Sequence, residues 1–397
     1  MHILHLNSSL DPAAGGPSIV LARMAAEQRR RGLDVTIITA DAPGKLGAVI
    51  GTLQELGITV HETGPATGPL AKAPHAMSTL RRVLGTQRPD VAHLHGMWLH
   101  LLHWGSAELR RHRTPYIWRP CGMQDPWSLG QGRLKKKLFW MARGARDVNG
   151  AAALHFTTAT EQRLVGPLRL RPRGYVIANG LDWEEFDPPP EKGAFRAAQG
   201  FGAEPVVLFL SRLHHKKGLD LLLPAFAQGA PAEARLALAG PGESGYVAEL
   251  RERANALGIG ERTVFVGQLD GAARLQAMVD ADVFVLPSYQ ENFGVVVAEA
   301  AGVGAPILIS DQVNLCDALL AARAGRVTPC TVDAVAAGLR EILADPSAAR
   351  AMGDRAKAWA AASFPWTKVA DQIDAMYQDV VGAQARAESP VLPQPRG

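Results

Sequence analysis

Short runs of apolar residues alternate with longer amphipathic stretches along the first half of the chain. Each short run has the length of a buried strand, and the longer stretches between most of them are helical in character. The expected strands are His2–Asn7, Val35–Thr39, Ile58–His61, Val91–His95, Tyr116–Arg119, Ala153–Thr157 and Val176–Ile177, and the first expected helix is Pro17–Arg31. Strands separated by helices pair in parallel, so this half predicts a doubly wound α/β sheet whose ligands bind beyond the carboxyl ends of the strands.

A second series of the same kind follows a proline-rich segment. The sequence Asp187–Pro190 (DPPP) cannot continue a helix and is typical of a linker. Beyond it, strands are expected at Val206–Leu210, Arg235–Ala239, Thr263–Val266, Asp282–Leu286 and Ile307–Ile309, with a helix from Lys217 after the first of them. The chain therefore predicts two Rossmann-like domains, with a substrate crevice between them.

The end of the chain predicts one more helix. Thr367–Val381 carries Val369, Ile373, Met376 and Tyr377 at the spacing of one helical face. Glu388–Gly397 contains three prolines and predicts disorder. The expected divisions are a first domain (1–183), a linker (184–203), a second domain (204–363), a C-terminal helix (364–385) and a disordered tail (386–397).

The stretch Leu286–Pro306 combines an expected anion-binding turn with acidic side chains. A buried strand ends at Pro287, and a helix rich in Val and Ala is expected over Gly294–Gly302. The N–H groups at such a helix start carry partial positive charge and bind phosphate readily. Here these N–H groups belong to Asn292, Phe293, Gly294 and Val295.

Two glutamates flank this helix start. Glu291 precedes it and Glu299 lies inside the helix. Eight residues at about 100° each leave the two side chains roughly 80° apart, so both can face one crevice. Carboxylates repel a bare nucleotide, and ribose and sugar hydroxyls are therefore their natural partners. The alternative is that both are ordinary acids of a solvated surface.

A basic loop follows the first strand of the second domain. Ser211–Gly218 (SRLHHKKG) joins that strand to a helix whose start points toward the same crevice. Arg212 can bind phosphate oxygens through two parallel hydrogen bonds, and Lys217 supplies a point charge. Lys216 is an alternative to Lys217, although Lys217 directly precedes the glycine.

Three features of the first domain fall at the carboxyl ends of its strands. The loop after the first strand contains Gly15-Gly16-Pro17 but no G-x-G-x-x-G, which counts against a nicotinamide dehydrogenase. His95 ends its strand and is followed by a glycine, a position suited to an active site, although a histidine in a strand is also commonly a core residue. Arg119–Trp127 is a turn-rich stretch that either binds an acceptor or is an ordinary loop anchored by Trp127.

Positive charge is concentrated in the first domain. Residues 1–183 hold 23 Lys and Arg against 12 Asp and Glu, whereas the remainder holds 19 against 26. The basic clusters are Arg29–Arg31, Arg110–Arg113, Arg133–Lys137 and Arg169–Arg173. They indicate either solvated helix ends or an anionic partner surface. No nucleic-acid-binding signature accompanies them, so an anionic membrane is the better match.

The remaining composition bears on the compartment. The chain has three scattered cysteines without metal-ligand spacing, which favours a reducing environment. Its start lacks a basic leader with an apolar core, and no apolar run reaches the roughly 18 to 20 residues of a membrane span. We therefore expect a cytoplasmic protein, with peripheral contact at the inner membrane face as an option. Arg133–Trp140 (RLKKKLFW) either rests on such a membrane or packs as an ordinary helix.

These motifs together resemble the retaining glycosyltransferases of family 4, which have the GT-B fold. The resemblance is carried by ENFGVVVAE (Glu291–Glu299), by R-x4-K-G in the basic loop, and by HLHG followed by PCGMQDPW in the first domain. The resemblance extends through ALHFTTATEQ and IANGLD. Ala178 replaces the usual proline in the second of these, which should only loosen a turn. Asn179 and Gly180 are therefore still expected to be structural. The pattern is similar to bacterial enzymes of cell-surface polysaccharide and glycolipid assembly.

The resemblance implies a role for each candidate residue. The first domain would bind the acceptor, the second would bind the donor, and the last helix would cross back to the first. Glu291 would bind the hydroxyls of the donor sugar, Glu299 those of the ribose, and His95 would approach the sugar. Gly16 would bring the backbone close to donor phosphate and acceptor, while Arg212 and Lys217 would bind the diphosphate.

The expected activity is transfer of a hexose-type sugar, with retention, from a nucleotide-diphosphate sugar to a polysaccharide or lipid-linked acceptor. Uridine donors are favoured because they are commonest among such enzymes. Arg212, Lys217 and the helix start can replace the metal that many glycosyltransferases hold through Asp-x-Asp, so no metal or other cofactor is expected. The alternatives are a nucleotide-sugar epimerase of the same fold and a non-catalytic nucleotide-sugar-binding protein.

Overall fold

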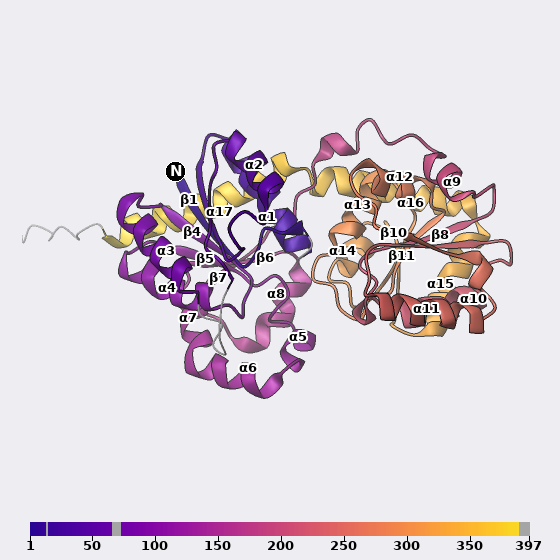
Figure 1. The fold of residues 1–397 in the computed structure, drawn as a ribbon, viewed down its shortest axis with the longest axis horizontal. Coiled ribbons are helices and arrows are strands. Elements are labelled where there is room, and N and C mark those ends of the chain that lie inside the picture. Colours follow the sequence, from indigo (N-terminus) through magenta and orange to yellow (C-terminus); the bar gives the residue numbers. More distant parts are fainter. Residues whose placement is uncertain (13–14, 66–72, 389–397) are drawn as a thin grey trace, which may run out of the picture. The chain divides into compact units, whose positions relative to one another are not determined.

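The computed structural model describes residues 1–12, 15–65 and 73–388 (Figure 1). The chain forms two compact units, each built around its own sheet. The first unit comprises Met1–Gly180 together with Trp366–Gly397, and the second comprises Leu181–Pro365. The doubly wound α/β architecture predicted for both halves is confirmed.

The sheet of the first unit has the order β3-β2-β1-β4-β5-β6-β7, and all of its described pairs are parallel. Its strands are β1 (His2–Asn7), β2 (Asp34–Thr39), β3 (Thr59–Glu62), β4 (Val91–His95), β5 (Tyr116–Arg119), β6 (Ala153–Phe156) and β7 (Arg173–Val176). The helices between them are α1 (Gly16–Arg30), α2 (Gly47–Glu55), α3 (Pro74–Thr86), α4 (His100–Arg111), α5 (Pro126–Gly130), α6 (Arg133–Phe139), α7 (Ala145–Asn149) and α8 (Ala159–Val165), with a π-helical turn η2 (Trp140–Gly144) between α6 and α7.

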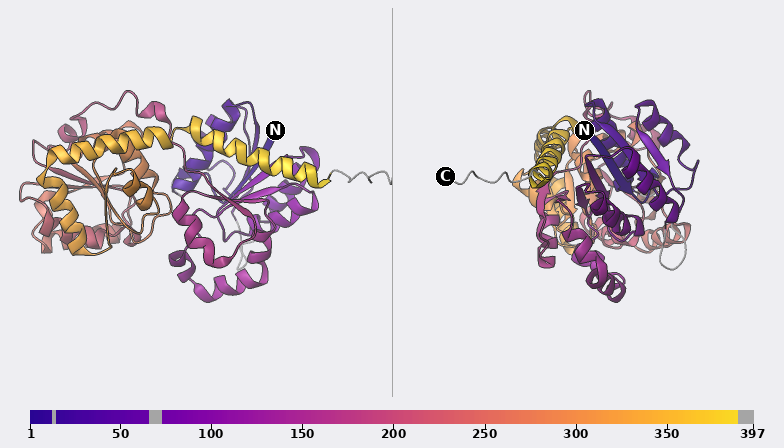
Figure 2. Two further views of the ribbon diagram at one scale, coloured as in Figure 1. Left: turned by 180° about the vertical axis from the view of Figure 1, so that it is seen from behind. Right: turned by 90° about the vertical axis from the view of Figure 1, so that its left-hand side faces the viewer.

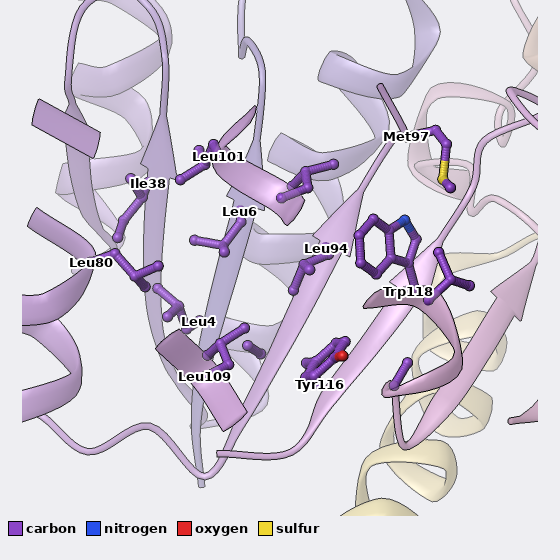
Figure 3. Packing of buried hydrophobic residues seen from close by; sticks show 14 of the residues in the cluster. Leu4, Leu6, Ile38, Leu80, Leu94, Met97, Leu101, Leu109, Tyr116 and Trp118 are labelled. Atoms are coloured by element: carbon purple, nitrogen blue, oxygen red, sulfur yellow. The ribbon is translucent and has the colours of Figure 1, made fainter. Parts of the chain in front are cut away.

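Alternate residues of these strands point to opposite faces of the sheet, and the two faces differ in character. On one face, Leu4 and Leu6 of β1, Leu94 of β4 and Trp118 of β5 pack with apolar residues of α3 and α4 (Figure 3). The opposite face carries histidines: His5 of β1 lies beside His93 of β4 in the strand register. Burial of the apolar face stabilises this unit. The histidine face also carries apolar residues, because Ile37 of β2 pairs with His5 in the strand register and belongs to a second buried cluster.

The second unit has the strand order β10-β9-β8-β11-β12-β13, also parallel in its described pairs. The strands are β8 (Val206–Leu210), β9 (Arg235–Ala239), β10 (Thr263–Gly267), β11 (Val283–Leu286), β12 (Ile307–Ser310) and β13 (Arg326–Thr328). The helices are α9 (Ala194–Gln199), α10 (Leu219–Gly229), α11 (Ser244–Ala256), α12 (Ala272–Asp280), α13 (Val295–Val303), α14 (Cys316–Ala321), α15 (Val332–Ala344) and α16 (Pro346–Ser363). β8 and β11 are neighbours, so the loops that follow them meet at one edge of this sheet.

One strand was missed, and three predicted elements need correction. β13 was missed because Arg326–Thr328 is short and only partly apolar, and β7 lies at Arg173–Val176 rather than at 176–177. The helix expected from Lys217 begins instead at Leu219, after a 3-10 turn, η5, over His215–Lys217. The last helix continues well beyond residue 381, and residues 389–397 of the predicted tail lie outside the described residues.

The last helix, α17 (Trp366–Glu388), packs against the first unit (yellow in Figure 2). Arg31, at the end of α1, forms ion pairs with Asp371 and Asp374 at 2.6 and 2.8 Å. These partners raise the pKa of Arg31 although burial of its side chain acts in the opposite direction. Tyr377 of the same helix is fully buried. Residues more than 300 positions apart in the chain thus stabilise one domain.

Candidate active site

The basic loop after β8 is held close to the loop after β11. Gly218 has a left-handed backbone (φ 71°), and a Cβ atom there would overlap the carbonyl oxygen of Pro287. The N–H of Tyr289 donates to the carbonyl oxygen of Lys216 at 2.9 Å. Glycine is therefore required at 218 because any side chain would separate the two loops. The glycine that follows Lys217 is thus explained by packing.

The structure brings two of the predicted site residues into contact. Lys217 Nζ donates a hydrogen bond to Glu291 Oε2, and the two side chains are only 11% and 19% exposed. Arg212 lies five residues before Lys217 in the same loop; its side chain is exposed and has no hydrogen-bond or ion-pair partner among the described residues. The loop that carries R-x4-K-G therefore contacts the turn that opens E-x7-E through a partly buried ion pair, and Arg212 is exposed in the same loop.

The turn between β11 and α13 is fixed on both sides. The N–H of Glu291 donates to Gln312 at 3.0 Å, and the N–H of Asn314 donates to the carbonyl oxygen of Glu291 at 2.9 Å. Gly294 precedes α13 with φ 71°, and Phe293 is buried against Phe364. The helix start predicted as an anion site is therefore held on both sides, and its positive end, at Val295, follows Glu291 by four residues.

The angle predicted between the side chains of Glu291 and Glu299 was wrong, because it assumed that the residues between them are helical throughout. Glu291 pairs with Val313 as an isolated bridge and lies outside α13, which begins only at Val295. The 100° step per residue does not apply to residues 292–294, so the separation of Glu291 and Glu299 is set by the turn and not by helix geometry. The structure places Glu291 against Lys217, while Glu299 is 8% exposed within the helix.

Glu299 has a cationic partner that the sequence analysis missed. Arg274 of α12 contacts Glu299 Oε1 at 3.2 Å and Glu185 Oε2 at 2.5 Å. Burial lowers the pKa of Arg274, but the two carboxylates outweigh it and the pKa is raised. The guanidinium therefore stays charged and orients Glu299. No local motif marks Arg274, since a single arginine in an amphipathic helix is ordinary, and Glu185 lies 89 residues away from it in the chain.

The candidate residues of the first unit are less accessible than expected. His95 is 1% exposed, and its ring nitrogens lie within hydrogen-bonding distance of His5 and Arg119. Gly16 is the exposed first residue of α1, beside residues 13–14, which lie outside the described residues. Asn179, expected to be structural, accepts a hydrogen bond from Arg119. The predicted roles of His95 and Gly16 toward a sugar donor stay predictions.

The stretch after β5 forms the short helix α5. Asp125 caps this helix by accepting a hydrogen bond from the N–H of Ser128 at 2.7 Å. Trp127 is 40% exposed, so it is not the buried anchor that one of the two interpretations required. The buried residues of this stretch are instead Arg119, Pro120, Gly122, Gln124 and Asp125.

The chain contains one Asp-x-Asp sequence, Asp280–Asp282, which the expectation of a metal-free site did not consider. Its two carboxylates have structural partners. Asp280 accepts hydrogen bonds from the backbone N–H groups of Gly193, Phe195 and Arg196, and Asp282 pairs with the Arg196 side chain at 2.6 Å. This triplet therefore fixes the start of α9 to the core of the second unit.

A group of histidines could also be considered as metal ligands. Nitrogen atoms of His5, His93 and His95 lie within 4.8 Å of one another, and all three rings are buried. However, each has hydrogen-bond partners in the protein, and the nearest charged group is the Arg119 guanidinium. A buried divalent cation beside a fixed guanidinium, without a carboxylate ligand, is electrostatically unfavourable. The group does not fit a metal site.

Known protein families match both halves of the chain. Residues 15–180 match the model of the glycosyl transferase 4-like domain, and residues 191–359 match that of glycosyl transferases group 1. Together the two matches span most of both units, which identifies the protein as a glycosyltransferase of the GT-B class. Within that class the chain belongs to family 4.

Similar proteins act on different substrates. A GDP-mannose-dependent alpha-(1-6)-phosphatidylinositol monomannoside mannosyltransferase of Mycolicibacterium smegmatis is 32% identical over 196 residues, which are 47% of this chain and 51%, about half, of that relative. A D-inositol 3-phosphate glycosyltransferase of Nocardia farcinica is 28% identical over 382 residues, 90% of this chain and 83% of the relative. The fold matches that of Anabaena HepE in complex with UDP, with a TM-score of 0.78, 22% identity and coverage of 96% and 100%.

Replacing Gly218 by alanine is expected to damage the site through packing alone. The left-handed backbone and the overlap with Pro287 should cost more than about 2 kcal/mol of stability and should lower sugar transfer with every donor. Gly245→Ala is the matched control, because Gly245 lies in α11 with open space around it, and alanine there should be neutral or stabilise by up to about 1 kcal/mol. Thermal unfolding and turnover of both variants test this; equal behaviour would contradict it.

Proposed function

We propose that the protein transfers a hexose-type sugar, with retention, from a nucleotide-diphosphate sugar to a glycan or lipid-linked acceptor. The contact between Lys217 and Glu291, with Arg212 in the same loop, is the observation that carries this proposal. It places a cation suited to a diphosphate beside a carboxylate suited to sugar hydroxyls. A UDP-sugar is the favoured donor, and the solved complexes of similarly folded HepE with UDP and with UDP and glucose support this choice.

The chemistry follows from where charge develops. When the anomeric C–O bond to the diphosphate breaks, negative charge grows on the leaving phosphate. Arg212, Lys217 and the start of α13 stabilise that charge without a metal ion. A new C–O bond to the acceptor hydroxyl forms on the same face, and the hydroxyl proton passes to the leaving phosphate. Glu291 binds sugar hydroxyls, and Glu299, oriented by Arg274, binds the ribose.

Double displacement is the second route to retention. It requires a carboxylate close to the anomeric carbon as a nucleophile. Glu291 already pairs with Lys217, which lowers its nucleophilicity. The front-face route is therefore preferred, and trapping of a glycosyl-enzyme intermediate would overturn that preference.

The test of the proposal is turnover of a panel of UDP-, GDP- and ADP-sugars with and without acceptor oligosaccharides or glycolipids. Sugar transfer is expected only with acceptor present, and NMR of the product should show the donor's anomeric configuration. An epimerase would consume or isomerise the donor without any acceptor. A non-catalytic binding protein would show ligand-induced thermal stabilisation and no turnover.

We also propose that the first unit contacts an anionic membrane through α6 and η2. Leu134, Leu138 and Met141 are 72%, 54% and 63% exposed and recur at the spacing of one helical face. Lys135 and Lys137 are exposed on the same helix. Apolar side chains flanked by cations suit the surface of a bilayer with acidic lipids. No described helix is both long and apolar enough to cross a membrane.

Glutamate at both Leu134 and Leu138 is expected to lower binding to vesicles that contain an anionic phospholipid by roughly tenfold or more, because each leucine loses its apolar contact with lipid and gains a repelled charge. Leu320→Glu is the control, since Leu320 is 50% exposed in the second unit. Lys136 should be left intact, because its ammonium donates to the carbonyl oxygen of Ser128 at 2.6 Å. Co-sedimentation that is unchanged in the double variant would remove the proposal.

A further inference from the structure

The histidine-bearing face of the first sheet contains an unbroken chain of buried hydrogen bonds. One half joins Arg119 to His95 (3.5 Å), His95 to His5 (2.9 Å) and His5 to Gln28 (2.8 Å). The other half joins Gln28 to Tyr377 (3.0 Å), Tyr377 to His93 (2.9 Å), His93 to His155 (3.2 Å) and His155 to the carbonyl oxygen of Ile177 (2.9 Å). We call this chain the histidine relay. It connects β1, β4, β5 and β6 with helices α1 and α17.

The two ends of the relay fix the direction of every hydrogen bond. The carbonyl oxygen of Ile177 can only accept, so His155 must carry its proton on Nε2 and accept through Nδ1. His93 then donates from Nε2 and accepts at Nδ1 from the Tyr377 hydroxyl. Tyr377 in turn accepts from the amide nitrogen of Gln28. Each step leaves only one arrangement for the next.

The donors and acceptors in the half from Gln28 to Arg119 can be assigned in the same way, and no two donors or two acceptors meet. With its nitrogen turned to Tyr377, Gln28 presents its oxygen to His5, which must donate from Nε2. His5 Nδ1 accepts from His95 Nε2, and His95 Nδ1 faces Arg119, which can only donate. The reverse direction would place two acceptors together at Ile177 and two donors together at Arg119. As long as the rings are neutral, all four imidazoles are therefore protonated on Nε2.

We propose that His5, Gln28 and Tyr377 are positioning residues that hold His95 in one neutral tautomer, with Nδ1 as an acceptor at the end of β4. The contact of Nδ1 with Arg119, at 3.5 Å, is the longest in the relay, so Nδ1 is the relay acceptor least committed to a partner within the protein. His93 stacks on His95 with ring centroids 4.4 Å apart, so Tyr377 orients the His95 ring through both halves of the relay. The relevance to sugar transfer rests on the proposed function.

The surroundings of the relay disfavour an added proton. Burial and the nearby Arg119 lower the pKa of His5 to about 4 and that of His155 to about 3, and the pKa values of His93 and His95 are also well below the ordinary range. The charged groups around it are Arg119, Asp374 beside Tyr377, and Glu161 beside Arg119. A further proton would set two N–H groups against each other within the chain. His95 thus stays an acceptor throughout the neutral pH range.

NMR of protein labelled with 15N-histidine tests the relay without any activity assay. Single His→Asn variants assign the long-range proton–nitrogen correlations of each ring. These correlations should show His5, His93, His95 and His155 protonated on Nε2 at pH 7, and the same pattern at pH 6. A Nδ1-protonated or charged ring at any of these four positions would overturn the inference. If the relay is found as expected while the wild type transfers no sugar, the proposed function fails and the relay stands.

Tyr377→Phe tests the positioning role. It removes the donor to His93 and leaves the Gln28 amide nitrogen without an acceptor, so the His93 signals should change. We expect kcat to fall about tenfold, the equivalent of one buried hydrogen bond, with the KM for donor changed less than threefold.

Tyr175→Phe is the matched control, since the Tyr175 hydroxyl also bonds to α17, at Asp379, but on the surface. Gln28→Met interrupts the relay if Tyr377→Phe does not fold. Unchanged His93 and His95 signals and kcat in the folded variant would refute positioning.

Discussion

Replacing Arg212 and Lys217 together by alanine is expected to abolish measurable sugar transfer. Each cation alone should cost on the order of 10² in kcat, by analogy with the loss of one donor to a developing oxyanion. The two losses should combine to more than about 10³, because both cations proposed for the leaving phosphate are then gone and the start of α13 supplies only partial charge. Steady-state kinetics with the best donor of the panel measure this effect.

Lys216→Ala is the matched control for this experiment. Lys216 is adjacent to Lys217, but it is Lys217 that donates to Glu291, so the control should retain turnover within about threefold. Nucleotide binding should weaken in the double variant, and the folded fraction should not change. If kcat survives in the double variant while Lys216→Ala is inactive, the assignment of the cation is wrong.

Acid is expected to unfold the first unit before the second. The folded pKa values of His5 and His155, about 4 and about 3, lie below the value of about 6.5 for an exposed histidine. The folded relay therefore binds fewer protons than the unfolded chain, and its contribution to stability, complete above pH 6.5, is lost as the pH falls toward 4. Each histidine removes about 1.4 kcal/mol per pH unit in this window.

Hydrogen exchange followed by mass spectrometry can resolve this loss for each unit. Between pH 7 and pH 5, peptides from β1 and β4 should lose protection by several kcal/mol in total, after correction for the intrinsic exchange rate. Peptides from β8 and β11 serve as an internal reference, since the relay lies wholly in the first unit. Equal changes in the two units would contradict a neutral relay.

The alternation of apolar runs with amphipathic stretches predicted most of the fold. β1, β4, β5, β8 and β9 end where the apolar runs end, because strongly apolar parallel strands leave little freedom in their length. β13 was missed because its three residues, Arg326–Thr328, do not form an apolar run. The start of α10 was placed too early because the left-handed Gly218 interrupts the helix before Leu219.

The candidate site was predictable where its residues lie in one loop or in two loops at one sheet edge. Lys217 and Glu291 met as the strand-end rule implies, whereas the helical estimate for Glu299 failed because residues 292–294 are not helical. Arg274 could not be found, since nothing local distinguishes it. A partial signal existed for the relay: His93 and His95 alternate on one strand and so share a face. No sequence signal linked Tyr377 to the relay, because it lies 284 residues from His93 in the chain.

The central claim is that fixed cations of the protein, rather than a metal ion, stabilise the departing diphosphate. The most direct test is the rate of nucleoside diphosphate release, with donor and acceptor present, before and after extensive dialysis against EDTA. The same rate is expected in both, with no stimulation by added Mg²⁺ or Mn²⁺. A rate that disappears with EDTA and returns with either metal would contradict it.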